Sequence, residues 1–314
     1  MNAGGRRLAA ALLAVAVAAP AAARADPVRV FDDEGRLVQL HGPVQRVVSL
    51  APHLTEMLFA AGAGARVVGV DQHSDYPAAA RALPRVGDGL RIDVERILSV
   101  KPDLVVLWSY GALPAASQKQ PLQQLQDMGV AVYYSHPAQL SDIPDEIGRF
   151  GRIMGTAGAA DAAADRLRHK LQDLAFRYAA QRPVRVFYQI GGNPAYTVNG
   201  RSMISHALGI CGGVNVFAAL RPTSPIVGTE NVLVANPQAI IAGGSDAQSR
   251  NRLAAWKKYA PGLAAAALGN LWTVDADRMH RPGPRMIEET GQLCEYLDQA
   301  RQRAYADSAP AEPR

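Results

Sequence analysis

The stretch Val94-Glu-Arg-Ile-Leu-Ser-Val-Lys-Pro-Asp-Leu-Val-Val-Leu-Trp108 is matched later in the chain by Thr229-Glu-Asn-Val-Leu-Val-Ala-Asn-Pro-Gln-Ala-Ile-Ile-Ala242. In both copies a Glu precedes an aliphatic pair, a Pro follows the Glu seven residues on, and a β-branched apolar run follows the Pro. Such self-similarity is typical of a duplicated structural unit. We therefore expect two equivalent halves, each presenting one carboxylate, Glu95 or Glu230, at the same place.

Short apolar runs alternate with helical patterns along both halves of the chain. The runs have the length and β-branched content of buried strands, and the helical patterns between them are about ten residues long. Strands that alternate with helices in this way indicate parallel βαβ units. The predicted strands are Arg46–Leu50, Val67–Val70, Leu104–Trp108, Val130–Tyr134, Arg185–Ile190, Ala239–Ala242 and Leu271–Val274.

A longer helical pattern, Ala157 to Gln181, lies between the two halves. Leu167, Leu171, Leu174 and Tyr178 fall on one face of this helix. A helix of some 25 residues spans roughly 37 Å at 1.5 Å per residue. We therefore predict an α/β protein of two Rossmann-like lobes with mainly parallel sheets, joined by a long backbone α-helix. The alternative is an ordinary surface helix on one continuous domain.

The first 25 residues are typical of a secretory signal peptide. Arg6 and Arg7 precede a short apolar core, and Ala23-Arg24-Ala25 fits a small-residue cleavage site. The core is too short to span a bilayer. We expect export to the periplasm and the following division of the chain: signal peptide 1–25, first lobe 26–155, connecting helix 156–182, second lobe 183–306 and a disordered tail 307–314.

The charge of the chain is nearly balanced once the leader is removed. The whole chain carries 33 Lys and Arg against 28 Asp and Glu, and the leader holds three of the basic residues and no acid, so 30 stand against 28. Nucleic-acid binding needs a concentrated basic face, which this balance does not favour. No segment after the leader has the ~18 uninterrupted apolar residues of a transmembrane helix.

The chain has two cysteines, Cys211 and Cys294. In an oxidising compartment an even pair favours one disulfide, and two buried free thiols are the alternative. Neither Cys has a second Cys or a His at ligand spacing, so a zinc site is not expected.

Aromatic and charged residues gather in the segments that follow the predicted strands. Ligands of parallel α/β folds bind beyond the carboxyl ends of the strands, and a cleft between two lobes is a natural site. These segments hold Tyr76, Trp108, Tyr110 and Tyr196, with several His and Arg residues. Flat rings and a few cations suit a large, flat, partly anionic ligand.

Several short motifs occur in a definite order along the chain. They are Ser49-Leu-Ala-Pro-His-Leu-Thr-Glu56, Ser74-Asp-Tyr-Pro77, Lys101-Pro-Asp-Leu-Val105, Asn193-Pro-Ala-Tyr196, Cys211-Gly-Gly-Val-Asn215, Asn236-Pro-Gln-Ala-Ile240, Pro284-Arg285 and Gln292-Leu-Cys294. In this order they resemble the periplasmic cobalamin-binding proteins of ABC importers, within the iron-siderophore and cobalamin solute-binding class. The resemblance covers most of the chain after the leader, from about Arg46 to Leu297.

The resemblance implies two lobes joined by a backbone helix, little hinge closure and a Cys211–Cys294 bridge. It also gives the repeated carboxylates a role, because Glu95 and Glu230 match the lobe-tip acids that meet Arg residues of the membrane permease in that family. Charge-assisted carboxylate–Arg pairs orient two partners and steer their encounter. Each Glu taken singly is also explained as a helix-start residue favoured by the macrodipole.

The resemblance further implies a ligand site. Trp108, Asp277 and Arg281 fall on positions similar to those that line the cobalamin cleft of the family, and Tyr196 lies near another. Trp108 as core packing and Arg281 as a solvated surface charge are the alternatives. His73 and Tyr76 are further candidates for ligand binding.

The chain departs from the family where that pocket is aromatic, because His73, Gly89, Ile190 and Ser224 stand at about those positions. This difference allows a different corrinoid, haem or a ferric siderophore as the ligand. His73, Tyr76 and His280 are then the residues that could ligate an iron or cobalt centre.

The sequence has no Gly-x-Ser-x-Gly elbow, P-loop or His-Glu-x-x-His motif, so it does not favour an enzyme. We predict a monomeric solute-binding protein of an ABC importer, with cobalamin or a related corrinoid as its transported ligand and no cofactor or bound metal of its own. A haem or ferric-siderophore receptor is the alternative.

Overall fold

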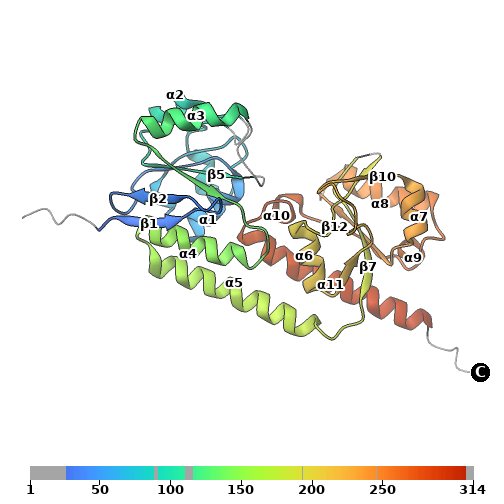
Figure 1. The fold of residues 1–314 in the computed structure, drawn as a ribbon. Coiled ribbons are helices and arrows are strands. Elements are labelled where there is room, and N and C mark those ends of the chain that lie inside the picture. Colours follow the sequence, from blue (N-terminus) through green and yellow to red (C-terminus); the bar gives the residue numbers. More distant parts are fainter. Residues whose placement is uncertain (1–25, 88–90, 110–115, 193, 245, 309–314) are drawn as a thin grey trace, which may run out of the picture.

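The computed structural model describes residues 26–87, 91–109, 116–192, 194–244 and 246–308. The predicted signal peptide and residues 309–314 of the predicted tail lie outside these ranges. Figure 1 shows two α/β lobes side by side, with long helices running beneath them. The first lobe opens with an antiparallel hairpin of β1 (Val28–Phe31) and β2 (Leu37–Leu40).

The sheet of the first lobe is entirely parallel, with the strand order β4-β3-β5-β6. One of its faces packs against α1 and α4, and the other packs against α2 and α3. The strands are β3 (Val47–Ser49), β4 (Val67–Val70), β5 (Leu104–Trp108) and β6 (Ala131–Ser135), and the helices are α1 (Pro52–Ala60), α2 (Val94–Ser99), α3 (Ala116–Asp127) and α4 (Asp142–Met154), with 3-10 turns at Gly64–Arg66 and Ala78–Ala82.

The sheet of the second lobe is also parallel, with the order β12-β11-β7-β9. Its strands are β7 (Val184–Gln189), β9 (Gly213–Asn215), β11 (Ala239–Gly243) and β12 (Leu271–Val274), beside a small antiparallel pair of β8 (Ala195–Tyr196) and β10 (Ile226–Val227). Its helices are α6 (Met203–Ile210), α7 (Thr229–Ala235), α8 (Ala247–Tyr259), α9 (Ala264–Ala267), α10 (Ala276–Met279) and α11 (Pro284–Ser308). α11 ends two residues inside the predicted tail.

The two sheets share one topology, which confirms the duplication predicted from the repeat. In each sheet the first strand is central, the second lies on one side of it, and the third and fourth lie on the other. Helices α2 and α7 each bury one aliphatic side chain, Ile97 and Val232. Each helix is followed by a residue with positive φ, Lys101 at 46° and Asn236 at 38°, and then by the shared Pro. The left-handed residue thus turns the chain from helix to strand in both copies.

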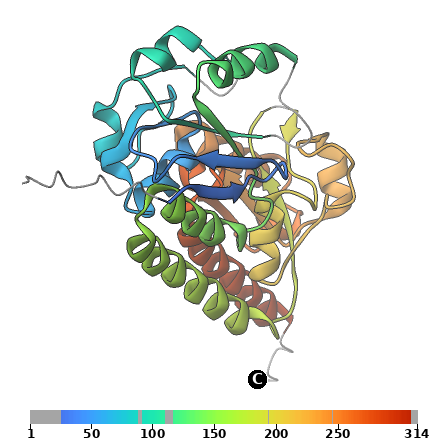
Figure 2. The same ribbon diagram turned by 60° about the vertical axis from the view of Figure 1, so that its left-hand side comes forward.

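The connecting helix α5 (Ala157–Tyr178) forms as predicted, and Leu167, Leu174 and Tyr178 face the core. It packs along α4 and against α11, as Figures 1 and 2 show. One continuous apolar cluster runs through these helices and reaches both sheets. The helix is therefore part of a shared core, which joins the lobes more firmly than an isolated strut would.

Some predicted boundaries are wrong. The helix expected at Thr55 begins at Pro52, so His53 lies in its first turn instead of in a loop. The helix expected to start at Pro121 begins at Ala116 and contains that proline. The hairpin β1–β2 and helices α4 and α8 were not predicted.

Helix α4 carries a buried carboxylate, Glu146, that gives a prediction of pH dependence. It accepts hydrogen bonds from the Tyr133 hydroxyl at 3.1 Å and the Arg149 Nε at 2.6 Å. Burial raises its pKa to about 7, although the charge of Arg149 opposes this shift. Because the pKa in the folded state exceeds the ordinary value near 4.5, the group stabilises the fold below pH ~4.5.

This contribution should be lost as the pH rises through 7. We expect the free energy of unfolding to fall by up to about 3 kcal/mol between pH 4.5 and 8, and Glu146→Gln to remove most of this fall. Denaturant unfolding at a series of pH values measures it, with Asp145→Asn on the exposed face of the same helix as the control. Parallel pH profiles for the wild type and Glu146→Gln would contradict the assignment.

Candidate functional site

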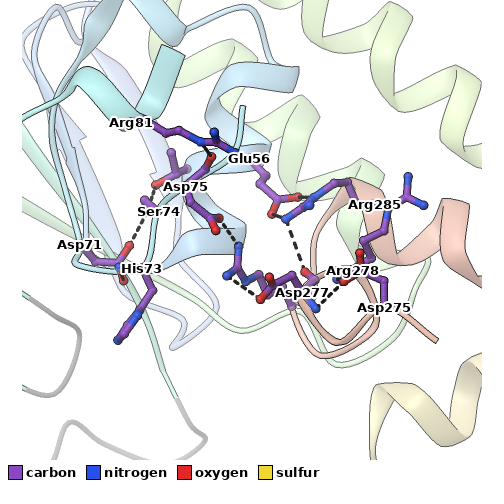
Figure 3. A network of polar contacts seen from close by, with 12 residues as sticks. Glu56, Asp71, His73, Ser74, Asp75, Arg81, Asp275, Asp277, Arg278 and Arg285 are labelled. Atoms are coloured by element: carbon purple, nitrogen blue, oxygen red, sulfur yellow. Dashed lines mark hydrogen bonds and ion pairs between the residues drawn. The ribbon is translucent and has the colours of Figure 1, made fainter. Parts of the chain in front are cut away.

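Segments that follow the carboxyl ends of strands in the two sheets meet between the lobes. Glu56 lies in α1, which follows β3, and Asp75 lies in the loop after β4. Arg281 and Arg285 come from the segment after β12, at the start of α11. Figure 3 shows the labelled members of this group converging from the two lobes. We call Glu56, Asp75, Arg281 and Arg285 the seam.

The first ion pair of the seam joins Arg281 to Asp75. Nη1 of Arg281 donates to Asp75 across the lobes at 2.6 Å, and Nη2 donates to Asp277 of its own lobe at 2.7 Å. Burial alone would raise the pKa of Asp75, but the hydrogen bond and charge of Arg281 lower it below its ordinary value. Asp75 therefore stays ionised, and the guanidinium is held by a carboxylate on each lobe.

The second ion pair is more deeply buried. Arg285 donates from Nε at 3.0 Å and from Nη2 at 2.6 Å to the two oxygens of Glu56, whose side chain is only 2 % exposed. Burial raises the pKa of Glu56 in spite of this bidentate contact. A Cβ at Gly283 would lie 3.4 Å from both Glu56 Oε2 and His53 Cβ. The segment of the second lobe before α11 thus packs within van der Waals contact of the first lobe.

Aromatic rings flank the seam. The guanidinium of Arg285 lies 4.2 Å from the ring centre of the half-exposed Tyr76, as a cation–π contact. The rings of His53 and Trp108 meet edge to face at 4.8 Å between centroids. His53 follows β3 and Trp108 is the last residue of β5. These strands are neighbours in the sheet, at the point where the strand order reverses. Ligands of open parallel sheets bind at such switch points.

His53 is almost completely buried, and its Nε2 has no hydrogen-bond partner among the residues that the structure describes. Burial, helped by the nearby charge of Arg281, lowers its pKa to about 3. The imidazole is therefore neutral at physiological pH. It offers an uncharged polar edge beside Trp108 rather than a third cation beside the two arginines.

The loop that carries Asp75 is held by buried hydroxyl groups. The Thr55 Oγ1 lies 2.9 Å from Ser49 Oγ and 2.7 Å from Ser74 Oγ, and the Ser74 hydroxyl donates to Asp71. These contacts join the end of β3, the start of α1 and the loop after β4. The position of Asp75 is therefore fixed by its own lobe.

The structure brings together part of the predicted ligand site. Tyr76, Asp277 and Arg281 lie in or beside the seam, and Trp108 reaches it through His53. His73 is exposed on the loop after β4, and Figure 3 shows its ring directed away from Asp277. Tyr196 is exposed in strand β8, and neither residue contacts the seam in the described part of the structure. Tyr110 and Gly89 lie outside the described residues.

His280, considered as a metal ligand, is largely buried, and its Nε2 lies 2.9 Å from the Tyr188 hydroxyl. Burial lowers its pKa. Within the described ranges, no group of three or more His, Cys, Asp or Glu residues is placed to hold a metal ion. None of the helices in the described part of the chain is long and apolar enough to cross a membrane.

Sequence reasoning missed Glu56 and Asp75 as site residues. Glu56 carried a signal, because it is the one ionisable carboxylate among the apolar residues of Leu54-Thr-Glu-Met-Leu58 and a buried carboxylate needs a partner. Asp75 belongs to the Ser74-Asp-Tyr-Pro77 motif, but no role was predicted for it. Neither partner was evident, because Arg281 and Arg285 are more than 200 residues away along the chain.

The repeated carboxylates Glu95 and Glu230 lie apart from the seam. Both are exposed in the first turns of α2 and α7, on different lobes. Figure 1 shows these two helices away from α5. Their predicted role in docking stays a prediction.

Two lobes of identical parallel topology, whose loops at the carboxyl ends face each other, define a two-lobed α/β binding protein. Comparison with known proteins agrees: residues 47–263 match the family described as periplasmic binding protein. The chain is 36 % identical over 255 residues to a vitamin B12-binding protein of Vibrio cholerae, with coverage of 81 % of this chain and 90 % of the relative. The chain belongs to the periplasmic binding protein family.

Solved structures give the same result. The crystal structure of the periplasmic vitamin B12-binding protein BtuF of Vibrio cholerae matches with a TM-score of 0.74 and 35 % identity, covering 83 % of this chain and 99 % of that one. A periplasmic heme-binding protein, RhuT from Roseiflexus sp. RS-1, shares the fold with a TM-score of 0.69 and 24 % identity, covering 82 % and 99 %. The family comprises solute-binding proteins of transport, which is a different class from enzymes.

Proposed function

We propose that this protein captures cobalamin or a related corrinoid between its two lobes and delivers it to the membrane permease of an ABC importer. The observation that carries the proposal is the similarity to the vitamin B12-binding protein of Vibrio cholerae, at 35 % identity over 99 % of its solved chain. Export would use the predicted leader, residues 1–25, and the carrier would act as a monomer without a cofactor of its own.

The proposed ligand contacts are Trp108, Tyr196, Asp277 and Arg281, with Tyr76 and His73 as further members. A corrin is a broad, flat macrocycle with amide side chains, so it suits aromatic faces ringed by a few hydrogen-bonding charged groups. The edge-to-face contact of Trp108 with a neutral His53 and the exposed ring of Tyr76 support this assignment. Asp277 and Arg281 would offer an acceptor and a donor to ligand amides.

Glu95 and Glu230 are proposed as the contacts to the permease. Each is exposed on an equivalent helix of a duplicated lobe, so one carrier presents two carboxylates in matched settings. A two-fold permease with an Arg cluster on each subunit would be complementary to such a pair.

A haem receptor is the second candidate, because a heme-binding protein shares this fold and His73 is exposed in the same loop as Tyr76. Calorimetric titration of purified, ligand-free protein with cyanocobalamin and, separately, with haemin distinguishes the two. Saturable 1:1 binding of cyanocobalamin with no haem Soret shift supports the proposal. A Soret shift that His73→Ala abolishes, without cyanocobalamin binding, refutes it.

Truncation of the Trp108 side chain gives a quantitative prediction for ligand affinity. We expect Trp108→Ala to weaken cyanocobalamin binding by about 30-fold, because a buried aromatic anchor is worth about 2 kcal/mol or more. The matched control is Trp272→Ala, since Trp272 stacks on Tyr296 at 5.2 Å in the second lobe. Equal affinities for the two variants in the same titration would remove Trp108 from the site.

A further inference from the structure

The seam contains two carboxylates of the first lobe that have no role in the proposed ligand contacts. Asp75 and Glu56 each hold an arginine of the second lobe, at 2.6 Å in both pairs. Both carboxylates lie on the first lobe and both guanidinium groups lie on the second, so each of the two ion pairs attracts one lobe to the other. Figure 3 shows Glu56, Asp75 and Arg285 at the point where the two lobes approach.

Hydrogen bonds tie the residues on both sides of the seam to their own lobes. The loop with Asp75 is bonded to the first lobe through Ser74 and Thr55. On the other side, Arg281 is bonded to Asp277, and Arg285 donates weakly to the Asp277 carbonyl at 3.4 Å. Two ion pairs between groups tied in this way fix a distance, whereas pairs between mobile loops would only follow the motion.

Burial makes separation of these pairs unfavourable. The side chains of Glu56, Arg285 and Arg281 are 2 %, 15 % and 16 % exposed, and only Asp75, at 49 %, is well solvated. In such a setting the attraction is little screened, and opening would leave charges without partners. A further polar contact, Leu140 N–H to His206 Nδ1 at 3.1 Å, also links the lobes.

The apolar packing alone would not fix the spacing at this point. Helix α5 and the shared cluster join the lobes along one side, and α1 touches α11 beside the seam. A hinge about that side would still open the loops at the carboxyl ends of the strands. The seam lies among those loops, where a tie limits the opening most effectively.

We propose that Asp75 and Glu56 are positioning residues, which hold Arg281 and Arg285 across the seam and thereby keep the lobes at the ligand-binding distance before the ligand arrives. The expected effect on ligand affinity rests on the proposed function, whereas the expected effect on the distance between the lobes is independent of it. A carrier held in this way would avoid part of the ordering penalty on binding and so gain affinity.

The spacing is tested on the full mature chain by double electron–electron resonance. Spin labels are placed on ketone side chains introduced at Gln124 of α3 and Lys257 of α8, both exposed, so that the native disulfide is untouched. The wild type should give one narrow distance distribution without ligand. Asp75→Asn with Glu56→Gln should broaden it toward longer distances, and Asp75→Asn alone should broaden it partially.

Two controls accompany this measurement. Asp145→Asn removes an exposed pair with Arg168 that does not cross the seam, and it should leave the distribution unchanged. Asp75→Glu keeps the carboxylate and should restore the narrow distribution. Circular dichroism confirms that each variant is folded, and the half-exposed Asp75 site keeps the test valid should Glu56→Gln fail to fold.

The ligand arm measures cyanocobalamin affinity in the same variants. The double variant should bind about tenfold more weakly, since only about a tenth of the molecules would hold the binding-competent spacing. An unchanged distance distribution in the double variant overturns the inference, and so does a broadened distribution with unchanged affinity. A wild type that binds no cyanocobalamin defeats the proposed function, while the distances still decide the role of the seam.

Discussion

Uptake of the ligand should be lost when both lobe-tip carboxylates are reversed, with Glu95→Lys and Glu230→Lys in one chain. Each change would replace the proposed carboxylate–Arg attraction with a like-charge repulsion, and truncation of one partner in such an interfacial pair already costs about 2 kcal/mol or more. For two sites we expect uptake to fall at least about 100-fold. Either single reversal should have an intermediate effect, because one lobe would still be engaged.

Ligand affinity should be unchanged in the same double variant, because Glu95 and Glu230 lie on α2 and α7, away from the seam. Calorimetry with cyanocobalamin on the purified carrier checks this, and transport assays with the permease in vesicles give the uptake. The matched control reverses Asp165 and Glu295, which are exposed on α5 and α11 and give the same change in net charge. Loss of affinity equal to the loss of uptake would refute separate roles.

The helix-start explanation of the two Glu residues makes a different prediction. A carboxylate in the first turn stabilises a helix by about 0.3–1 kcal/mol through the macrodipole. If that were its whole role, the double variant would show a slightly lower thermal stability with normal uptake. The two explanations are therefore separated by one transport measurement together with one melting curve.

The parallel sheets and the duplication could be predicted because their signals are local. A β-branched run after a Pro, as in Leu104–Trp108, is visible within about ten residues and was placed at its observed bounds. The structure adds that the equivalent residues Lys101 and Asn236 share a positive φ, which was not predicted from the sequence. Strand identity and order along the chain are properties of short segments, so reading them requires no knowledge of the tertiary fold.

Helix α4 could not be predicted in this way. Its sequence contains Pro144, Gly148 and Gly151, which are poor helix formers, and its helical state depends on packing. A Cβ at Gly151 would collide with Ala160 of α5, so the glycine permits the close approach of these two helices. The glycine therefore weakens the local signal for a helix and strengthens the tertiary contact that forms it.

The seam was beyond sequence reasoning for a similar reason. Arg281 was predicted to line the ligand site and Arg285 belonged to a motif of the family, but the partners of both residues depend on how the lobes are placed. Asp75 and Arg281 are separated by 206 residues. The structure changes the interpretation of Arg281, whose two terminal nitrogens already have carboxylate partners. It can bind a ligand amide only while sharing these partners, so it is an ordered group of low flexibility.

The predicted disulfide between Cys211 and Cys294 forms, and its removal should lower the stability strongly. It joins the end of α6 to the middle of α11, and both residues are completely buried. The bridge closes a loop of 83 residues, for which the chain-entropy relation gives about 4.5 kcal/mol. The paired variant Cys211→Ala, Cys294→Ala should lose about this amount of unfolding free energy in denaturant titrations.

The double alanine variant lacks both the S–S bond and the two sulfur atoms that pack in the core. The wild type reduced by dithiothreitol is the control, since it loses the bond and keeps the cysteine side chains. Both samples should unfold at a similarly lowered denaturant concentration. Although the bridge lies wholly in the second lobe, the apolar cluster through α5 and α11 is shared by both lobes. The whole transition should therefore move as one, and a shift confined to half of the amplitude, or a loss below about 1 kcal/mol, would contradict the prediction.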